Sequence, residues 1–344
     1  MSLRVCHLQE DGFPSWDEFV TRHAHGTCFH LTAWLRTIAS AFPFQPHYMS
    51  VYDGSECQAI VPLFLVDNWM MGRVLLSSPF AVYGGMLATS GEAKQLLRDA
   101  IIHLGSKLEV QYIELRNHDE SQCLGFPRLE RYLDYTQTVQ PMTGEELLQQ
   151  LPKKTRNMVR KSLKSDFSSR PARNLDGFYD LLSRNYRRLG TPIFPKHFFA
   201  TLLAEFGPGA DVREILLGDR LAAVSLNLLF REQMHTYYAA SLFALRQFAP
   251  NNFLYYDHLL WAGNNGYTLF DFGRSKVDSG NSDFKRHWDT TIRPLPYEVL
   301  LVKRKELPNF NPNNPKFDLA IRLWRLLPLG LTRALGPHMV KLFP

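Results

Sequence analysis

Cysteine is scarce in this chain, and the short motifs that mark the common nucleotide-binding and hydrolytic enzymes are missing. The four cysteines are scattered without a C-x-x-C pair, so free thiols in a reducing cytoplasm are the expected state. The sequence contains no Walker loop, no dinucleotide-binding glycine triplet and no G-x-S-x-G turn. It therefore lacks the signatures of P-loop NTPases, dinucleotide-dependent enzymes and α/β-hydrolases.

Long apolar runs are also absent. No uninterrupted apolar segment approaches the ~20 residues that a membrane-spanning helix requires. The first ten residues carry charged and polar side chains where a secretory leader needs an apolar run. We therefore expect a cytoplasmic protein that touches the inner membrane at most peripherally.

No metal site is expected. Three histidines and a cysteine lie close together at His23, His25, Cys28 and His30. A second pair of ligands at the spacing of a zinc finger does not follow them. The group is therefore not interpreted as a metal centre.

What the chain does have is the composition of a well-packed globular protein. Its 344 residues are 45% hydrophobic and 13% aromatic, which suits two domains rather than one. The formal net charge of +6 favours anionic partners, such as nucleic acid, phosphorylated substrates or an acidic membrane face.

Periodicity predicts strands mixed with helices. Apolar runs bounded by turn residues indicate strands at 59–66, 110–115, 221–230 and 268–272. Helical spacing appears at 92–104, 143–151, 153–164, 175–189, 196–205 and 252–262. Thr143 and Glu146 form a capping-box pattern, and Pro152 separates the second of these helices from the third. Such a mixture indicates an α/β or α+β architecture.

A faint internal repeat predicts a duplicated fold. Each copy has a glycine turn between two strands, then a helix and a further strand. The first pair of matching segments is Gly54 with 59–63 and Gly218 with 222–226; the second is 99–105 with 113–116 and 257–263 with 270–274. We therefore expect a first domain at 1–142, a second at 143–310 with the reactive groups, and a tail at 311–344.

Residues 237–297 carry the densest set of chemically useful side chains. The stretch contains Tyr-Tyr-Ala-Ala-Ser from Tyr237, Pro-Asn-Asn from Pro250, Asp-Phe-Gly-Arg-Ser from Asp271, and Phe-Lys-Arg from Phe284, followed by Trp288. In these motifs the chain resembles the FemAB family of non-ribosomal peptidyltransferases. A closer similarity is to the subgroup associated with exosortase (PEP-CTERM) and exopolysaccharide loci.

The resemblance implies two tandem acetyltransferase-like (GNAT) domains, and hence an α+β fold of mixed sheets flanked by helices. It also implies transfer of an aminoacyl group from aminoacyl-tRNA to an amine of a precursor. Phe284 and Lys285 match the phenylalanine–lysine pair at the family's reaction centre, and the basic helix beginning at Lys153 resembles the one that opens the family's second domain.

A chemical argument that does not depend on the resemblance also favours Lys285 as a catalytic residue. Acyl transfer builds negative charge on the carbonyl oxygen, and a fixed cation there stabilises the transition state more than the ground state. Phe284 and Trp288 would exclude water around it. The alternative is a solvated surface lysine, which is the commoner situation.

Other residues are candidates for substrate binding. Asp271 and Arg274 follow a buried strand, where they would contact substrate or form an internal ion pair. Tyr238, Asn252 and Tyr256 would orient an acceptor, although tyrosines at such spacing are more often part of a core.

The helix from Lys153 presents a basic stripe. Arg156 and Arg160 lie on one face of it, where they would bind phosphates of tRNA or of a nucleotide-linked substrate. A solvated helix face is the alternative interpretation.

Acyl-CoA is the competing donor. Acetyl-CoA enzymes hold the pyrophosphate on a glycine-rich turn at a helix start, whereas residues 246–251 here read Arg-Gln-Phe-Ala-Pro-Asn. Residues 78–85 also lack the arginine and aspartate that the peptidoglycan enzymes of the FemAB family have in their first domain.

The C-terminal stretch 316–341 is amphipathic and basic. It is expected either to pack on the first domain or to contact an anionic membrane peripherally.

The predicted function is FemAB-like acyl or aminoacyl transfer, forming an amide on an amine of a cell-envelope or exopolysaccharide precursor. Two alternatives stay open: a CoA-dependent N-acyltransferase acting on a sugar or lipid-linked saccharide, and a non-catalytic module that binds a carrier or precursor. No tightly bound cofactor is expected, and the donor substrate is aminoacyl-tRNA or acyl-CoA.

Overall fold

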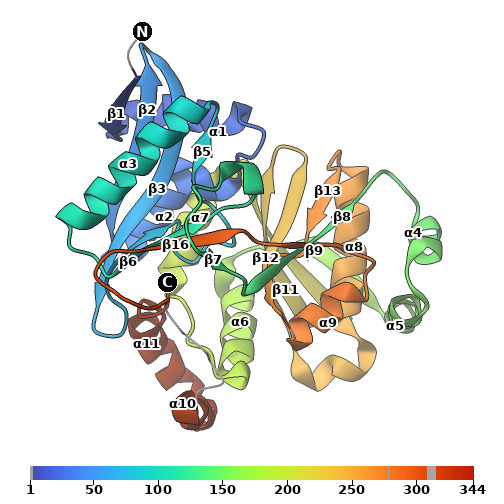
Figure 1. Cartoon of the computed structure of the whole chain (residues 1–344). Coiled ribbons are helices and arrows are strands. Elements are labelled where there is room, and N and C mark those ends of the chain that lie inside the picture. The colour runs from blue at the N-terminus through green and yellow to red at the C-terminus, as the bar shows by residue number, and fades with distance from the viewer. Residues whose placement is uncertain (1–2, 278, 308–314) are drawn as a thin grey trace. The chain divides into compact units, whose positions relative to one another are not determined.

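The computed structural model describes residues 3–277, 279–307 and 315–344, with the backbone alone for 315–318. The chain forms two compact units. Unit 1 comprises 1–131, 294–310 and 341–344, and unit 2 comprises 132–293 and 311–340. Figure 1 shows a sheet flanked by helices in each.

Unit 1 is built on an eight-stranded sheet ordered β1-β2-β3-β4-β6-β16-β7, with β5 paired to β3. All neighbouring strands are antiparallel except β4 and β6, which are parallel. The strands are β1 (Leu3–His7), β2 (Gln45–Asp53), β3 (Glu56–Asn68), β4 (Gly72–Ser77), β5 (Leu87–Ala88), β6 (Tyr112–Arg116), β7 (Arg128–Leu129) and β16 (Tyr297–Leu301), and the helices are α1 (Phe13–Arg22), α2 (Thr32–Ala41) and α3 (Gly91–Lys107).

Unit 2 has a second eight-stranded sheet, ordered β14-β8-β13-β12-β11-β10-β9, with β15 paired to β8. In this sheet β12 and β13 pair in parallel. The strands are β8 (Tyr132–Thr138), β9 (Phe167–Pro171), β10 (Ala210–Leu217), β11 (Arg220–Phe230), β12 (Gln233–Ser241), β13 (Leu269–Asp271), β14 (Ser275–Lys276) and β15 (Thr291–Pro294), and the helices are α4 (Gly144–Gln150), α5 (Lys153–Leu163), α6 (Leu175–Leu189), α7 (Lys196–Phe206), α8 (Pro250–Asn264), α9 (Gly280–Arg286), α10 (Pro315–Leu326) and α11 (Leu329–Val340).

The two sheets confirm the predicted mixed architecture, and they repeat the same order of elements. In each unit an antiparallel hairpin (β2-β3 or β10-β11) leads to a further strand, a helix (α3 or α8) and a parallel strand (β6 or β13). Gly54 and Gly218 occupy the two hairpin turns with φ of 59° and 56°, a conformation that glycine adopts without strain. The repeated segments in the sequence therefore occupy matching places.

One strand of each sheet comes from the other half of the chain. β8 follows β6 in sequence but pairs with β13 of unit 2, and β16 follows β13 but pairs with β6 of unit 1. The observed division therefore differs from the expected breaks at 142/143 and 310/311. The positions of β8 and β16 depend on hydrogen bonds to strands that are distant in the sequence. Local periodicity can predict a strand, but it does not indicate which strand will be its partner.

Apolar side chains form a core in each unit. In unit 1, α3 covers one face of the sheet with Leu97 and Ile101 among its buried residues. In unit 2, α8 packs on strand residues that include Phe270, together with Trp288 from just after α9. The predicted capping box at Thr143 is present and begins α4.

The C-terminal helices α10 and α11 pack on α6 of unit 2 (Figure 1). One of the two expectations placed the tail on the first domain, whereas these two helices belong to unit 2. Ile321 of α10 lies against Gly190, which follows α6. On α11, Arg333 forms an ion pair with Asp180 of α6 at 2.6 Å. Lys341–Pro344 group with unit 1.

Among the described residues, no helix is long and apolar enough to cross a membrane.

Candidate functional site

The parallel strands β12 and β13 pair over only three residues. Gln233 to His235 lie opposite Leu269 to Asp271, after which β13 ends while β12 continues to Ser241 along β11. A bulge shifts the β11–β12 register at Leu226/Asn227. The two strands thus diverge beyond His235 and Asp271, and polar groups gather where they part.

These polar groups lie on one face of three neighbouring strands. His235 of β12 is opposite Asp271 of β13, which in turn is opposite Thr136 of β8. Because strand side chains alternate, Asp134 lies on the same face as Thr136. All four side chains are buried, and His235 Nδ1 is 3.4 Å from Asp271 Oδ2.

Lys285 reaches this face from the short helix α9. The helix begins after Ser279, whose hydroxyl caps it by accepting a hydrogen bond from Ser282 N. The Lys285 side chain is only 8% exposed. Its ammonium donates to the carbonyl oxygens of Gly273 at 2.7 Å and Arg274 at 3.0 Å, which leaves one of its three N–H groups for another acceptor.

Burial lowers the pKa of Lys285 to about 8, while the carboxylates of Asp271 and Asp134 act in the opposite direction. Arg274 lowers this pKa further. The pKa of Asp134 is raised well above its usual value by burial and then by the charge of Asp271, so burial favours its protonated form. The cluster therefore contains one cation, Lys285, bound to backbone carbonyls and influenced by the carboxyl groups of Asp271 and Asp134.

The backbone of Gly273 links Asp271 to Lys285. Its φ is 73°, and a Cβ there would stand 3.0 Å from His235 Nε2. Its N–H donates to Asp271 Oδ1 at 2.5 Å while its carbonyl accepts from Lys285. Only glycine combines this backbone conformation with so close an approach.

The structure brings four of the other predicted residues near this point. Phe284 is half-buried beside Lys285, 5.4 Å from the Tyr255 ring between centroids. The Arg274 guanidinium lies 4.5 Å from the centre of the Tyr132 ring. Tyr238 continues β12 beyond the divergence and packs against the rings of Phe194 and Phe199. Burial raises the pKa of its hydroxyl well above the usual value, and the charge of Arg274 acts in the opposite direction. Asp271 belongs to the cluster itself.

Other predicted residues lie elsewhere in unit 2. Tyr256 is buried with its hydroxyl against Gly144 at the start of α4. Asn252 occupies the first turn of α8. Arg160 is exposed on α5, 3.8 Å from Glu145.

The basic helix α5 is nevertheless connected to α9. Thr155 donates a hydrogen bond to the carbonyl oxygen of His287, the residue that follows α9, and Lys154 Nζ is 3.2 Å from His287 Nε2. Lys153, Lys154 and Arg286 are exposed, and Arg156 is partly exposed. A cationic surface thus borders the element that carries Lys285.

Asp134 and His235 were missed by the sequence reasoning. Asp134 lies in β8, on the first-domain side of the expected boundary, and 151 positions separate it from Lys285. The signal that was available is an aspartate inside a strand-like alternation from Tyr132 to Thr138. His235 lies in a strand whose other eight residues are all buried or half-buried, so its position is that of a core residue.

Among the described residues, no group of three His, Cys, Asp or Glu side chains could hold a metal ion.

The corresponding place in unit 1 is filled by the chain itself. β4 and β6 pair at Leu75 with Ile113 and at Leu76 with Glu114, and then diverge. Residues 78–86 occupy the divergence, where Gly84 N donates to Arg116 O at 2.9 Å. The buried Arg116 guanidinium binds Glu114 at 2.9 Å and the carbonyls of three residues (Ser78, Ala81 and Pro344).

The start of α8 offers few amides to an anion. Pro250 has no N–H, Ala249 N donates to Arg246 O at 3.1 Å, and Asn252 N donates to Ala249 O at 3.0 Å. A pyrophosphate cradle needs several such groups directed outward. This helix start is therefore poorly equipped for one.

Comparison with known families and structures bears on the domain type and the fold. Residues 152–286 match the family model described as an acetyltransferase (GNAT) domain. No curated protein matches the chain significantly.

Solved structures share the fold at low sequence identity. The crystal structure of FemX has 14% identity and a TM-score of 0.63, and the match covers 87% of this chain and 98% of FemX. A tandem GNAT protein from the clavulanic acid biosynthesis pathway has 10% identity and a TM-score of 0.56, covering 87% of this chain and 98% of that protein. These matches confirm the expected α+β tandem GNAT-like fold. The family match over residues 152–286 places an acyltransferase-type GNAT domain in unit 2.

Proposed function

We propose that the protein is a FemAB-like N-acyltransferase that forms an amide on an amine of a cell-envelope or exopolysaccharide precursor. The observation that carries the proposal is the Lys285 ammonium, buried and held on two backbone carbonyls where β12 and β13 diverge. The nature of the acceptor rests on the resemblance to the exosortase-associated subgroup.

The reaction joins the acceptor nitrogen to the acyl carbon and breaks the bond from that carbon to its leaving group. Negative charge develops on the carbonyl oxygen during attack, and the remaining N–H of Lys285 would donate to it. In a buried site such a fixed donor stabilises the transition state more than it would in water. The proton lost by the amine goes to the leaving group.

Neighbouring residues support this donor. Asp271 accepts from Gly273 N and so keeps the Gly273 carbonyl directed at Lys285. Phe284, packed with Tyr255, excludes water from one side. Arg274 and Tyr238, which lie beyond the paired part of β12 and β13, would contact the substrates.

The first candidate donor is aminoacyl-tRNA. The start of α8 has few outward amides for a pyrophosphate, whereas Lys153, Arg156 and Arg160 form a basic surface on α5 beside α9. Lys and Arg side chains on a helix bind nucleic-acid phosphates with an affinity that falls as salt rises.

Acyl-CoA is the second candidate donor, because the GNAT domain match over 152–286 favours a CoA thioester. In that reaction the leaving group is the thiolate of CoA, and the part played by Lys285 is the same.

The experiment uses the full-length protein with two donors, a charged total tRNA pool and acetyl-CoA. Glucosamine and a lysine-containing muramyl pentapeptide nucleotide serve as the two amine acceptors, and amide formation is followed by mass spectrometry. Transfer from tRNA that is lost in Lys285→Met and kept in Lys276→Met supports the first donor, since Lys276 is exposed on β14. Transfer from acetyl-CoA alone establishes the second donor. If the folded protein neither binds nor transfers from either donor, the enzymatic proposal is overturned. A non-catalytic binding module is then the better interpretation.

A further inference from the structure

The helix α10 has two apolar faces. One face packs on unit 2, where Ile321 lies against Gly190 and Trp324 is buried. The other is a row formed by Leu319, Leu323 and Leu326, which are 62%, 56% and 76% exposed. Spacings of four and three residues place these leucines along one side of the helix.

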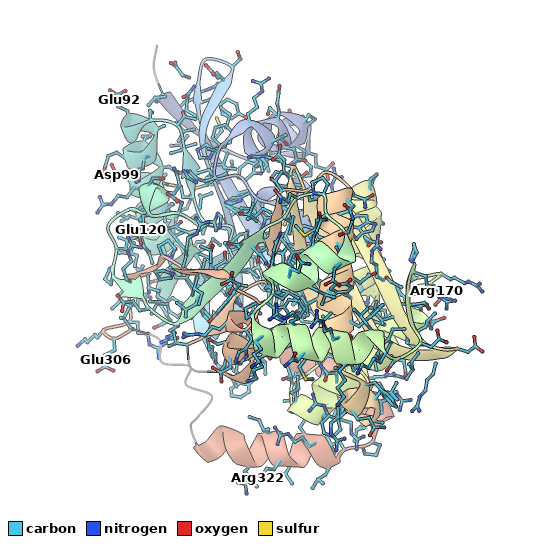
Figure 2. The ribbon with its side chains drawn as sticks, turned by 90° about the vertical axis from the view of Figure 1, so that its right-hand side faces the viewer. Glu92, Asp99, Glu120, Arg170, Glu306 and Arg322 are labelled. Carbon is cyan, nitrogen blue, oxygen red and sulfur yellow. The ribbon has the colours of Figure 1, made fainter. Side chains whose placement is uncertain are left out.

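Positive charge borders the leucine row. Arg322 and Arg325 of α10 are exposed next to it, and Figure 2 shows the Arg322 side chain extending outward from the helix. At the end of α6, Arg188 is exposed and Leu189 is 45% exposed. Arg325 donates to the Leu189 carbonyl at 3.2 Å, which places the end of α6 beside α10.

The last acidic residue of the chain is Asp318, near the start of α10. From Leu319 to Pro344 the sequence contains three arginines, one lysine and one histidine but no aspartate or glutamate. Exposed leucines in a row beside arginines are the pattern of a helix that lies in the interface of a bilayer.

We infer that α10 docks the protein on an anionic phospholipid surface. The leucine row enters the boundary between headgroups and acyl chains, and Arg322, Arg325 and Arg188 contact lipid phosphates. The underside of α10 stays on α6, so docking requires no unfolding of the helix from unit 2.

A second copy of the chain would fit the leucine row of α10 less well than an anionic lipid surface does. In a two-fold dimer the same patch would face itself, which would bring Arg322 and Arg325 of both copies together. Like charges brought together in this way oppose association, whereas anionic lipid neutralises them.

The inference does not depend on the acyl-transfer proposal. It is tested by flotation of the full-length protein with vesicles of phosphatidylcholine alone, or with about 30% phosphatidylglycerol. We expect the protein to float with the anionic vesicles and not with the neutral ones, and 0.5 M salt to weaken the binding.

Two variants separate the apolar and charged contributions. Leu319→Ser/Leu323→Ser/Leu326→Ser should abolish flotation, and Arg322→Glu/Arg325→Glu should weaken it at least about tenfold. The matched controls are Leu163→Ser, at an exposed leucine of α5, and Lys107→Glu/Lys305→Glu, at two exposed lysines of unit 1. Both should float like the wild type, with unchanged circular dichroism in all variants.

Three results would overturn the inference. The first is no flotation of the wild type with anionic vesicles, and the second is equal flotation of the leucine variant. The third is a wild-type dimer in light scattering that becomes a monomer in the leucine variant, which would assign the row to a second copy.

Discussion

The ammonium of Lys285 donates a 2.7 Å hydrogen bond to the carbonyl oxygen of Gly273, and the conformation of Gly273 depends in turn on Asp271. The cation is thus positioned by main chain rather than by a flexible partner. A donor fixed in advance needs little reorganisation during reaction, which is the property that the proposed chemistry uses.

Replacing Lys285 by methionine should lower the rate of acyl transfer about 10²–10³-fold, because the oxyanion loses its donor. Methionine keeps a similar length and apolar stem, so the fold should persist. Steady-state kinetics with the active donor, alongside circular dichroism, checks this. Lys276→Met is the control, and undiminished turnover in Lys285→Met would remove the residue from the mechanism.

The transfer rate should fall as pH rises through about 8. Burial lowers the Lys285 pKa to about 8, so the side chain is charged below that pH and neutral above it. A profile of kcat/KM against pH reports the free enzyme. In Lys285→Arg the descending limb should move to higher pH, because guanidinium stays charged. A rate that climbs through pH 8 would instead assign a neutral, proton-accepting amine.

Stability should depend on the same group. In the unfolded chain Lys285 regains a pKa near 10.5, above the folded value of about 8, so the unfolded state binds more protons between these values. The free energy of unfolding of the wild type, relative to Lys285→Met, should therefore rise with pH from 8 to 10.5, by about 3 kcal/mol. Urea titrations at several pH values measure this difference, and a flat or falling trend contradicts it.

Gly273→Ala should reduce both stability and transfer. The substitution forces a side chain into φ of 73° and brings Cβ to 3.0 Å from His235 Nε2, which should cost about 2 kcal/mol or more. Gly266→Ala is the matched control, since its φ is 87° with nothing within 4 Å; we expect a cost of about 1 kcal/mol and unchanged transfer. Equal activity of the two variants would show that the Gly273 turn is only structural.

Arg116→Met should destabilise unit 1 without affecting the chemistry of each folded molecule. It removes a buried cation from Glu114 and from the carbonyls of residues 78–86, at a cost of about 3–5 kcal/mol. Arg128→Met removes a surface ion pair with Glu120 and should cost less than about 1 kcal/mol. Thermal unfolding and active-site-normalised kinetics separate the two effects. A specific loss of turnover in Arg116→Met would place chemistry in unit 1.

Local signals predicted the elements well. The helix α6 was expected at 175–189 and is found there because its amphipathic pattern, its Asn174 cap and its closing Gly190 all lie within the segment. The same holds for the capping box at Thr143. Such features are properties of a few neighbouring residues.

The partners of β8 and β16 could not be predicted in that way. Pairing between β8 and β13 joins segments about 130 residues apart, and nothing in the local pattern of Tyr132–Thr138 distinguishes it from pairing within unit 1. The unpredicted pairing of β8 also limited the prediction of the site. The motif-bearing residues Asp271, Arg274 and Lys285 were found, whereas Asp134 was not, because it enters the cluster through the exchanged strand.

The exchange of β8 and β16 also governs the order in which the protein can be completed on the ribosome. Unit 1 begins to emerge first, yet the strand that pairs with both β6 and β7 is encoded after nearly all of unit 2. Until β16 is synthesised, β6 presents an unpaired edge of the kind that recruits other chains. The nascent protein is therefore most exposed to aggregation between the synthesis of β6 (Tyr112–Arg116) and that of β16 (Tyr297–Leu301), and a chain released before β16 should be insoluble.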